Sequence, residues 1–524
     1  MEVEDRNSQV LERSNFEDAL DSTHFGKYNL LMLATCCCLI LAMYIDIFGF
    51  SVVLPSVACD MRLSTSQQGM LSAVPLIGVM LSSYAWGLCA DTLGRRTTLL
   101  LAMPVGAILN VAVSIAPGFT SLAVLKLLSG AFTASANAAA FVLQGESVPR
   151  RHRSRFMFLM ASATMIVQFI IASIALPIFK LKFSIKISWL SLTYRPWRLL
   201  LQIISLPGVL GVVGLLFLKE SPKFFLSRGQ ENSSLDVLKV MYRWNTGLDP
   251  DSYPVKSLYV DEAPRPGQQS TSLLRRVWQQ TAPLFRPPLR SNSLKLYYML
   301  LCAYMTSTGY TMWVPTMTNA YFNGEDNSGK TFCEVASSAA TGKPSNHSNM
   351  VKPDCDAVVQ PLTLYAVMLY SGVSCTLNIF LTFIVEPLGK RRSTCLVFCV
   401  SILAGLLLLL VRIPLLSIAL FYIFLYVALI LGNVNTYLVE LNPTYLRGMA
   451  TCLSVVVARG FGFFSVQLIA GLLRDHCAPM VAGYIALVAS GLIVAFFLPP
   501  DSEKIVNVPK NTQIEDGSNK NEKF

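Results

Sequence analysis

Three ionisable residues, Asp46, Lys126 and Arg459, lie inside long apolar stretches of the sequence. An ionisable side chain in hydrocarbon costs about 2.5 to 3.5 kcal/mol on insertion scales, and such residues are retained where they pair with another charge or face water. Each of the three is therefore a candidate for a polar site inside the apolar part of the protein.

A second group of charged residues lies in short turns that occur twice along the chain. Residues 91–96 contain an acid, a glycine and two arginines, and residues 386–392 repeat this pattern 295 residues later. Two glutamate and arginine pairs with a spacing of seven also recur, 294 residues apart, and these are Glu146 with Arg153 and Glu440 with Arg447. Matching offsets predict two similar halves.

Long apolar stretches surround these residues. Of 524 residues 53% are hydrophobic and 14% are charged, which excludes a water-soluble surface of ordinary polarity. A bilayer span needs roughly 20 mostly apolar residues in a helix. Twelve such stretches are expected, near residues 29–54, 68–90, 97–116, 121–144, 156–178, 198–218, 296–315, 361–385, 394–411, 415–438, 449–473 and 480–498.

Lysine and arginine set the expected orientation, because short cytoplasmic loops collect them. With the amino terminus inside, the inner loops hold the arginines of 91–96, 150–155 and 386–392 together with Arg447. The basic segment 179–197 is an exception on the outer side. The net charge of +11 is then mainly a topology signal, and we expect no nucleic-acid partner.

The predicted organisation is an all-α membrane protein with twelve transmembrane helices in two six-helix pseudo-repeats, the major facilitator fold. We expect a cytoplasmic tail (1–28), a first half (29–218), a cytoplasmic linker (219–295), a second half (296–498) with an outer loop (316–360), and a cytoplasmic tail (499–524).

Several motifs resemble those of a known family. The run Gly87 to Arg96 resembles the major facilitator signature, with Thr92 where a base is usual. The run from Glu220-Ser221-Pro222 to Asn245-Thr246-Gly247, with Pro196-Trp197-Arg198, resembles the synaptic vesicle glycoprotein two and synaptic-vesicle-related transporters, relatives of sugar and organic-ion porters. That family often has two acids in its first span, where this chain has Met43 and Asp46.

The resemblance implies a central cavity lined by the first and fourth spans of each half. Asp46 and Lys126 would then pair there or exchange that bond for one with a solute; a purely structural pair is the alternative. For Arg459 the two alternatives are a role in solute binding and a structural role in close helix packing beside Gly460 and Gly462. The expected cavity residues are Asp46, Lys126, Asn137, Asn433, Asn435 and Arg459.

The charged turns are expected to form a cytoplasmic gate that closes in one conformation and opens in the other. Ordinary positive-inside anchoring is the alternative. The gate residues are Gly87, Asp91, Gly94, Arg95, Arg96, Glu146 and Arg153, with Glu386, Gly389, Arg391, Glu440 and Arg447 as the second copy.

The outer loop 316–360 contains Cys333 and Cys355, for which we expect a local disulfide, and Asn346, a glycosylation acceptor. No zinc-ligand spacing, nucleotide-binding glycine loop or nucleophile elbow is evident, so we expect no enzyme, metal or cofactor.

We expect a secondary transporter of a small organic solute, with organic ions included and with or without a coupling ion. It would act as a monomer in the lipid bilayer of the plasma membrane or of an intracellular vesicle, with both termini cytoplasmic. The alternative is a non-transporting membrane glycoprotein, a vesicle component or receptor that retains the fold.

Overall fold

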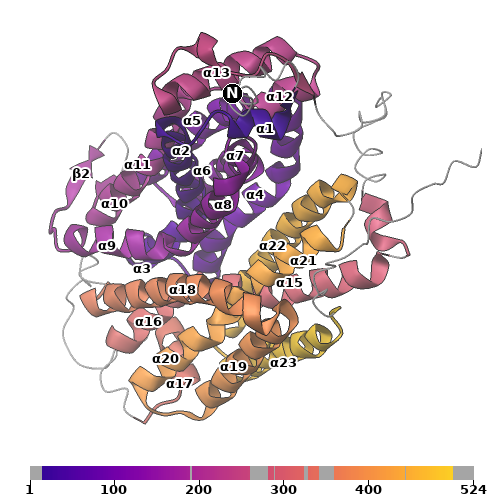
Figure 1. Ribbon diagram of the computed structural model, residues 1–524. Helices are drawn as coiled ribbons and strands as arrows, with labels where there is room; N and C mark the ends of the chain where they lie inside the picture. Colours follow the sequence, from indigo (N-terminus) through magenta and orange to yellow (C-terminus); the bar gives the residue numbers. More distant parts are fainter. Residues whose placement is uncertain are drawn as a thin grey trace, which may run out of the picture.

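The computed structural model describes residues 14–188, 192–259, 281–287, 289–323, 329–341, 359–442 and 444–499. The described chain is mostly helical and forms two bundles side by side, which we call the N-terminal half and the C-terminal half (Figure 1). The N-terminal half comprises α2 (Lys27–Tyr44), η1 (Ile45–Gly49), α3 (Phe50–Met61), α4 (Thr65–Leu93), α5 (Arg95–Ser114), α6 (Phe119–Thr133), α7 (Ser135–Glu146), α8 (Arg150–Met165), α9 (Val167–Ile178), α10 (Pro196–Ile204) and α11 (Leu206–Phe217).

Among the described residues, the C-terminal half contains nine α-helices and two 3-10 helices. Its elements are η4 (Ala282–Phe285), α15 (Arg290–Thr311), α16 (Val314–Asn323), α17 (Phe332–Thr341), α18 (Pro361–Leu388), α19 (Lys390–Leu410), α20 (Pro414–Leu425), η6 (Tyr426–Leu429), α21 (Ile430–Glu440), α22 (Thr444–Leu472) and α23 (Cys477–Phe496).

Smaller elements lie at the two ends of the N-terminal half. These are β1 (Ser14–Asn15), α1 (Phe16–Asp21), β2 (Ile185–Ile187), β3 (Leu192–Tyr194), α12 (Pro222–Ser227), α13 (Glu231–Thr246), η3 (Pro250–Ser252) and β4 (Leu258–Tyr259). Strands β2 and β3 form an antiparallel hairpin with Ile185 opposite Tyr194. Strands β1 and β4 pair in parallel, so the amino-terminal segment and the linker meet.

Ten helical segments of the described residues are long and apolar enough to span a membrane, and α8 with α9, bent by 47°, makes an eleventh. The expected stretch 296–315 covers most of α15 and the start of α16, and α15 is less apolar than these spans. Helix α15 carries many tyrosines, serines and threonines, and most of its side chains are buried against α22 and α23. A helix enclosed by protein does not need an apolar surface all round, because little of it faces lipid.

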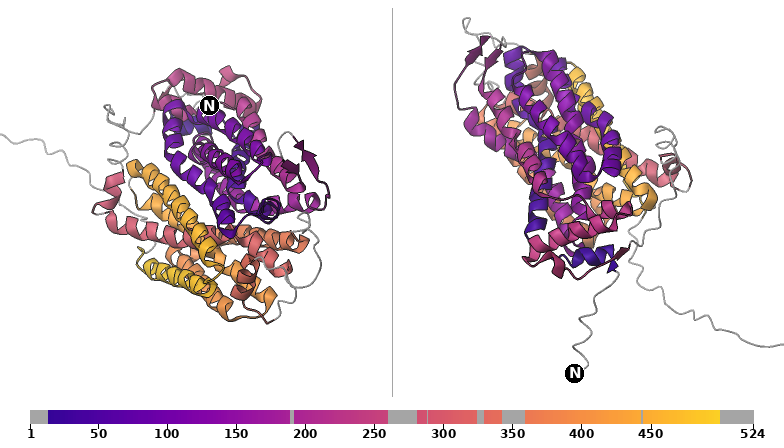
Figure 2. Two further views of the ribbon diagram at one scale, coloured as in Figure 1. Left: turned by 180° about the vertical axis from the view of Figure 1, so that it is seen from behind. Right: turned by 90° about the horizontal axis from the view of Figure 1, so that it is seen from above.

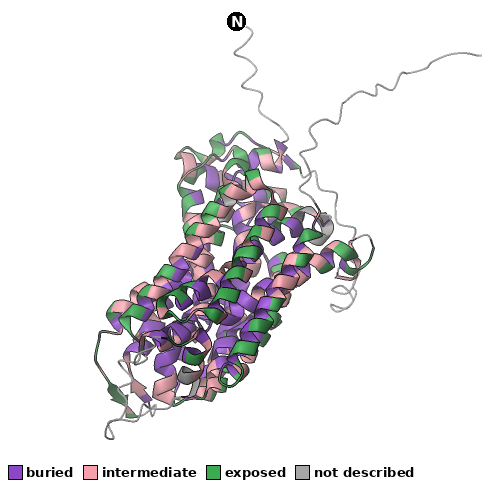
Figure 3. Ribbon diagram, turned by 90° about the horizontal axis from the view of Figure 1, so that it is seen from below, coloured by how far each residue is buried: buried purple, intermediate pink, exposed green. Residues whose placement is uncertain are grey.

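Apolar surface covers the outside of the molecule instead. Large hydrophobic side chains such as Phe383 and Leu410 are 72% and 74% exposed, and exposed segments run along the outer faces of the bundle (Figure 3). A water-soluble protein does not expose so many, whereas lipid chains would cover them.

The start of α4 illustrates how local sequence sets a helix end. Ser64 accepts a hydrogen bond from the backbone N–H of Gln67, and the Gln67 side chain accepts one from the backbone N–H of Ser64. This reciprocal capping box satisfies two backbone donors that the first helical turn leaves free. The loop 62–64 can therefore be very short.

Small residues let helices α4 and α6 approach closely. A Cβ atom on Gly78 would lie 2.3 Å from the carbonyl oxygen of Leu127, and one on Gly130 would lie 2.7 Å from that of Pro75. Glycine at both sites brings the backbones into direct contact, as is common between membrane helices. Helix α6, which carries Lys126, is thereby fixed against α4.

The two halves repeat each other in detail at the charged turns. Gly94 has φ 107° and ψ 155° between α4 and α5, and Gly389 has φ 87° and ψ 148° between α18 and α19. The guanidinium of Arg96 donates to the carbonyls of Leu215 and Leu216 near the end of α11, and that of Arg391 donates to the carbonyl of Phe496 at the end of α23. The 295-residue offset thus relates equivalent positions.

The linker and the amino-terminal segment together cover one end of the N-terminal half. Helices α12 and α13 lie across that end in both views of Figure 2. Asn245 on α13 accepts from the N–H of Tyr28 and donates to the carbonyls of Thr23 and His24. The start of α2 is therefore held by the linker as well as by its neighbours in the bundle.

Candidate functional site

Asp46 lies in an irregular turn within the first span. Residues Ile45–Gly49 form a π-helical turn between α2 and α3, and a single π turn inserted in a helix frequently marks a functional site. The Asp46 side chain is fully enclosed, and its main-chain carbonyl accepts a hydrogen bond at 2.9 Å from Nζ of Lys126. One lysine therefore contacts both the backbone and the side chain of Asp46.

One face of α6 surrounds the Asp46 carboxylate. Nζ of Lys126 lies 2.5 Å from Oδ1, while the hydroxyls of Ser129 and Thr133 donate to Oδ2 at 2.5 and 3.1 Å. Positions 126, 129 and 133 are three and four residues apart, so they share one face of a helix. The lysine ammonium also lies 5.5 Å from the centre of the Phe50 ring. The expected contact between Asp46 and Lys126 is therefore present, with the carboxylate fully paired.

The space beside this pair is small. A cavity of about 20 Å³ lies inside the N-terminal half, lined by Asp46, Lys126, Asn110 and Ser205 among others. That volume accommodates about one water molecule. Drug-sized organic ligands occupy roughly 300 to 1,000 Å³. In this conformation neighbouring helices enclose both side chains, and the assignment of the pair to a solute cavity stays a prediction.

Arg459 lies at the boundary between the halves. Its side chain is 5% exposed, and its guanidinium carbon is 5.4 Å from the centre of the Tyr44 ring of the N-terminal half. Tyr304 of α15 is within electrostatic reach of both residues. Next to it, a Cβ atom on Gly460 would lie 3.3 Å from the sulfur of Met80 on α4. Arg459 thus faces groups from both halves.

The three asparagines have different environments. Asn433 is buried and donates to the hydroxyls of Ser393 and Thr394 at 2.9 and 3.0 Å. It joins α21 to the start of α19, so its amide is not free for a solute. Asn435 is exposed on α21, and Asn137 is half-buried on α7. Of these, Asn137 is the asparagine that we keep as a cavity candidate.

Arg95 organises the charged turn of the N-terminal half. Its guanidinium lies 3.3 Å from Asp91 and 3.2 Å from Glu146, and it also lies over the Phe224 ring. The prediction that Arg153 joins Glu146 is wrong. Arg153 instead donates to Glu17 at 2.7 Å, because α1 folds back beside the start of α8.

Glu220 and Ser221 complete this cluster, and sequence reasoning did not assign them a role. The Glu220 carboxylate accepts from the backbone N–H groups of Arg96 and Thr97 at 3.0 and 3.1 Å. A carboxylate at the positive end of a helix is favourable, and α5 begins there. Ser221 donates to Glu146 at 2.5 Å. The Glu-Ser-Pro motif and the charged turn were both visible in the sequence, but the contact between the motif and residues 94–97 was not.

Gly94 has a conformation that this cluster requires. Its φ of 107° favours glycine, and a Cβ atom there would lie 2.4 Å from the Glu220 carboxylate. Gly87, in contrast, lies within the C-terminal third of α4, and no atom outside its own helix turn lies within 4 Å of such a Cβ. The side chains of Glu386, Glu440 and Arg447 lie outside the described residues, so the second copy is described only at Gly389 and Arg391.

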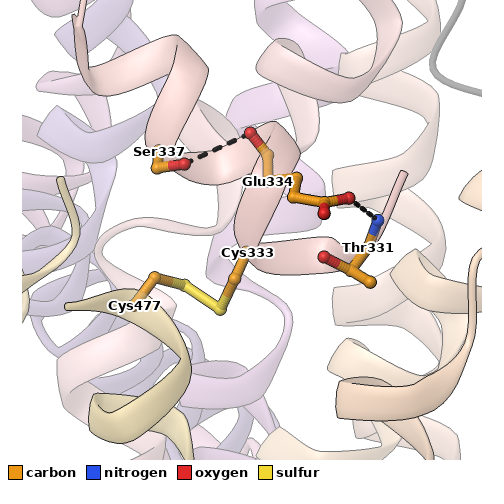
Figure 4. Close-up of a disulfide and its surroundings, with 5 residues drawn as sticks. All are labelled: Thr331, Cys333, Glu334, Ser337 and Cys477. Atoms are coloured by element: carbon orange, nitrogen blue, oxygen red, sulfur yellow. Dashed lines mark hydrogen bonds between the residues drawn. A yellow bond between two sulfur atoms is a disulfide. The ribbon is translucent and has the colours of Figure 1, made fainter. Parts of the chain in front are cut away.

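The outer loop forms a different disulfide from the one expected. Cys333 on α17 bonds to Cys477 at the start of α23, 144 residues further along the chain (Figure 4). The prediction that Cys333 pairs with Cys355 is wrong because residues 332–341 form a helix packed against α23 instead of a local loop. Cys59 is also disulfide-bonded. Cys355 and Asn346 lie outside the described residues.

Within the described ranges, no group of three or more histidine, cysteine, aspartate or glutamate side chains is arranged to hold a metal ion.

Long apolar helices in two matching halves, with charged turns at equivalent positions and ionisable groups inside, define a multi-pass membrane protein of the transporter type. A protein-family model described as Major Facilitator Superfamily matches residues 36–466 of this chain. The chain belongs to this superfamily.

Two groups of known proteins are similar to the chain. Human synaptic vesicle glycoprotein 2B is 24% identical over 334 residues, which is 59% of this chain and 48% of the relative. Rat synaptic vesicle glycoprotein 2A is 25% identical over 296 residues, 52% of this chain and 39% of the relative. The chain thus matches about half the length of these curated relatives.

Solved structures with the same fold include the xylose transporter XylE from E. coli. Its partially occluded inward-open conformation has a TM-score of 0.63 at 12% identity, covering 91% of this chain and 99% of that one. Its inward-open conformation has a TM-score of 0.61 at 13% identity, covering 91% and 97%. At this identity the likeness establishes the fold.

Proposed function

We propose that the protein is a secondary transporter that moves a small organic solute by alternating access of a site between its two halves. The observation that carries this proposal is Arg459, a buried cation of the C-terminal half whose guanidinium carbon lies 5.4 Å from the centre of the Tyr44 ring of the N-terminal half. Ionisable groups placed between moving bundles commonly mark substrate pathways.

The contacts between the halves favour an inward-facing conformation. A Cβ atom on Gly69, near the expected outer end of α4, would lie 2.5 Å from Ala470 near that of α22. Gln168 donates to the carbonyl of Thr311, and α3 packs against α16 at the same end. The inner turn, in contrast, leaves the Asp91 side chain 63% exposed. The outer side is thus closed while the inner turn remains accessible.

The charged turns would control the inner side. The exposed side of Asp91 would face a partner from the other half when the inner side closes. The ion pair with Arg95 would hold Asp91 in position for this contact. Glu146 and Glu220 hold Arg95 and the start of α5 in place. In this proposal the residues from Glu386 to Arg391, with Glu440 and Arg447, act in the same way in the C-terminal half.

Asp46 and Lys126 are the proposed link to an ion gradient. A relative by fold is described as a D-xylose-proton symporter, with a TM-score of 0.58 and 15% identity over 90% of this chain and 97% of that one. Exchange of the Asp46–Lys126 contact for a contact with a coupling ion or a solute would release Lys126 from this carboxylate. A pair of groups with two arrangements can bias the two conformations. The water-sized cavity supplies polar neighbours for a released ammonium.

The proposed membrane is the plasma membrane or that of an intracellular vesicle, with the amino-terminal segment, the linker and the carboxyl terminus on the cytoplasmic side. The disulfide between Cys333 and Cys477 supports an oxidising environment for the opposite side. A monomer is sufficient, because the proposed site lies between halves of one chain.

Uptake into proteoliposomes that contain the purified protein tests this function. A panel of organic anions, organic cations and neutral sugars would be offered with and without a proton gradient. We expect saturable uptake of at least one solute. Absence of flux with every solute, in protein that retains its thermal transition, would favour the non-transporting membrane glycoprotein instead.

A further inference from the structure

Three lysine or arginine side chains are buried in the described part of the chain, and their surroundings differ. Lys126 is paired with Asp46. Arg198 donates to the carbonyls of Ser114 and Ala116, both at 2.8 Å. Arg459, at 5% exposure, has neither a carboxylate nor a carbonyl partner among the described residues. Its Nε is buried and makes no hydrogen bond there.

An unpaired buried guanidinium is costly, because its charge loses hydration and its donors lose hydrogen bonds. The ring of Tyr44 compensates part of this cost through a cation–π contact. Among the described residues Lys126 contacts the Asp46 carboxylate and Arg198 contacts two backbone carbonyls, whereas Arg459 has neither kind of partner. A ligand that brings an oxyanion would therefore complete the site.

The surroundings of Arg459 also indicate the shape of this ligand. Tyr44 stacks on Phe48 with an interplanar angle of 17°, and the guanidinium of Arg459 lies over the Tyr44 ring. Flat aromatic side chains favour a flat apolar ligand body. The planar guanidinium fork matches a carboxylate, which it can bind through two parallel hydrogen bonds.

We propose that Arg459, with Tyr44, binds the carboxylate end of a planar organic anion between the two halves. This inference rests on the proposed function for the location of the site and specifies the class of solute. Binding would join α22 to the first span of the opposite half, so the anion would favour a conformation in which the halves approach around it.

Three probes of one shape test the charge requirement: benzoate, neutral benzamide and cationic benzamidine. Each would be titrated into the full-length protein in lipid nanodiscs while the midpoint of thermal unfolding is followed. A ligand that binds the folded protein raises this midpoint. We expect a saturable rise of the midpoint with benzoate and none with benzamide or benzamidine. Acetate, which has a carboxylate but no ring, should give a smaller rise than benzoate.

Variants identify the residue. Arg459→Gln should weaken the apparent benzoate affinity by at least about tenfold, and Arg459→Lys should retain part of it. Arg412→Gln removes an exposed arginine elsewhere and is the matched control, which should bind like the parent. Equal stabilisation by benzamide, stabilisation by benzamidine, no effect of benzoate, or full binding by Arg459→Gln would each overturn the proposal.

Chemical modification of the parent protein covers the case in which Arg459→Gln does not fold. Phenylglyoxal reacts with guanidinium groups, and benzoate should protect Arg459 from it in peptide mass spectra while benzamide should not. Equal modification with and without benzoate would contradict the inference. Benzoate binding without uptake of any solute would refute the proposed transport alone. Uptake of a sugar or a cation without benzoate binding would refute the anion site alone.

Discussion

Nζ of Lys126 lies 2.5 Å from Oδ1 of Asp46, and both side chains are enclosed within the N-terminal half. Breaking a dry buried pair by removing one partner costs about 3 to 5 kcal/mol, because the other charge is left uncompensated. Asp46→Asn and Lys126→Met should therefore each lower both thermal stability and transport.

The double variant Asp46→Asn with Lys126→Met should lose less stability than the sum of the single variants, because the two sites interact directly. Recovery of expression together with recovery of flux would show that the pair is only structural. Recovery of expression without flux is the expected result if the pair links transport to a gradient. Single variants that fold and transport like the parent would exclude any role for the pair.

Gly94→Ala should destabilise the protein, whereas Gly87→Ala should not. The backbone of Gly94 occupies a region that is almost exclusive to glycine, so a side chain there costs about 1 to 3 kcal/mol, and the new Cβ would meet Glu220. Gly87 lies in a helix with open space around it, where alanine gains roughly 0.5 to 1 kcal/mol. Thermal midpoints of the two purified variants measure the difference, and equal midpoints would contradict the described turn.

Glu17 should make the amino-terminal segment sensitive to acid. Burial acts to raise the pKa of Glu17, but the hydrogen bond and charge of Arg153, with Arg150, outweigh it and hold the pKa below its usual value. A lowered pKa contributes stability that is present above the unfolded pKa and lost as pH falls through the folded pKa. The parent should thus be more stable than Glu17→Gln at pH 7, and this difference should shrink below about pH 4.5. A difference that grows on acidification would refute the ion pair.

The disulfide and the glycan test the membrane orientation. Cys333→Ser and Cys477→Ser should each create one new free thiol. A membrane-impermeant maleimide should label this thiol on intact cells, or in vesicles only after the lumen has been opened. Enzymatic deglycosylation should shift the mobility of the parent but not of Asn346→Gln. Glycan on Asn232, which lies on linker helix α13, would instead mean that the orientation is inverted.

Sequence periodicity and repeats anticipated the parts of the structure that depend on local pattern. The equivalence of Gly94 with Gly389, and of Arg96 with Arg391, followed from one offset because both turns must reverse the chain between the same pair of helices. The contact between Asp46 and Lys126 also followed, since two buried opposite charges in neighbouring spans are costly apart.

Long-range geometry could not be anticipated in the same way. The π turn at Asp46 depends on the packing around it, and nothing in the residues 45–49 marks it. Glu17 competes successfully for Arg153 because a polar tail folds back on the bundle. Cys333 is nearer in sequence to Cys355 but bonds to Cys477, since an unforeseen helix places it beside the start of α23.

The most direct test of alternating access is a cross-link between the halves on their outer side. Gly69→Cys with Ala470→Cys places two cysteines on opposite halves, where the Cβ positions would be only 2.5 Å apart and need to separate by about 1 to 2 Å for a disulfide. Solute flux in proteoliposomes would be measured after oxidation and again after reduction, with the parent treated identically. We expect the cross-linked protein to be inactive and reduction to restore its flux. Full flux in quantitatively cross-linked protein would contradict the proposal that the halves move apart on the outer side.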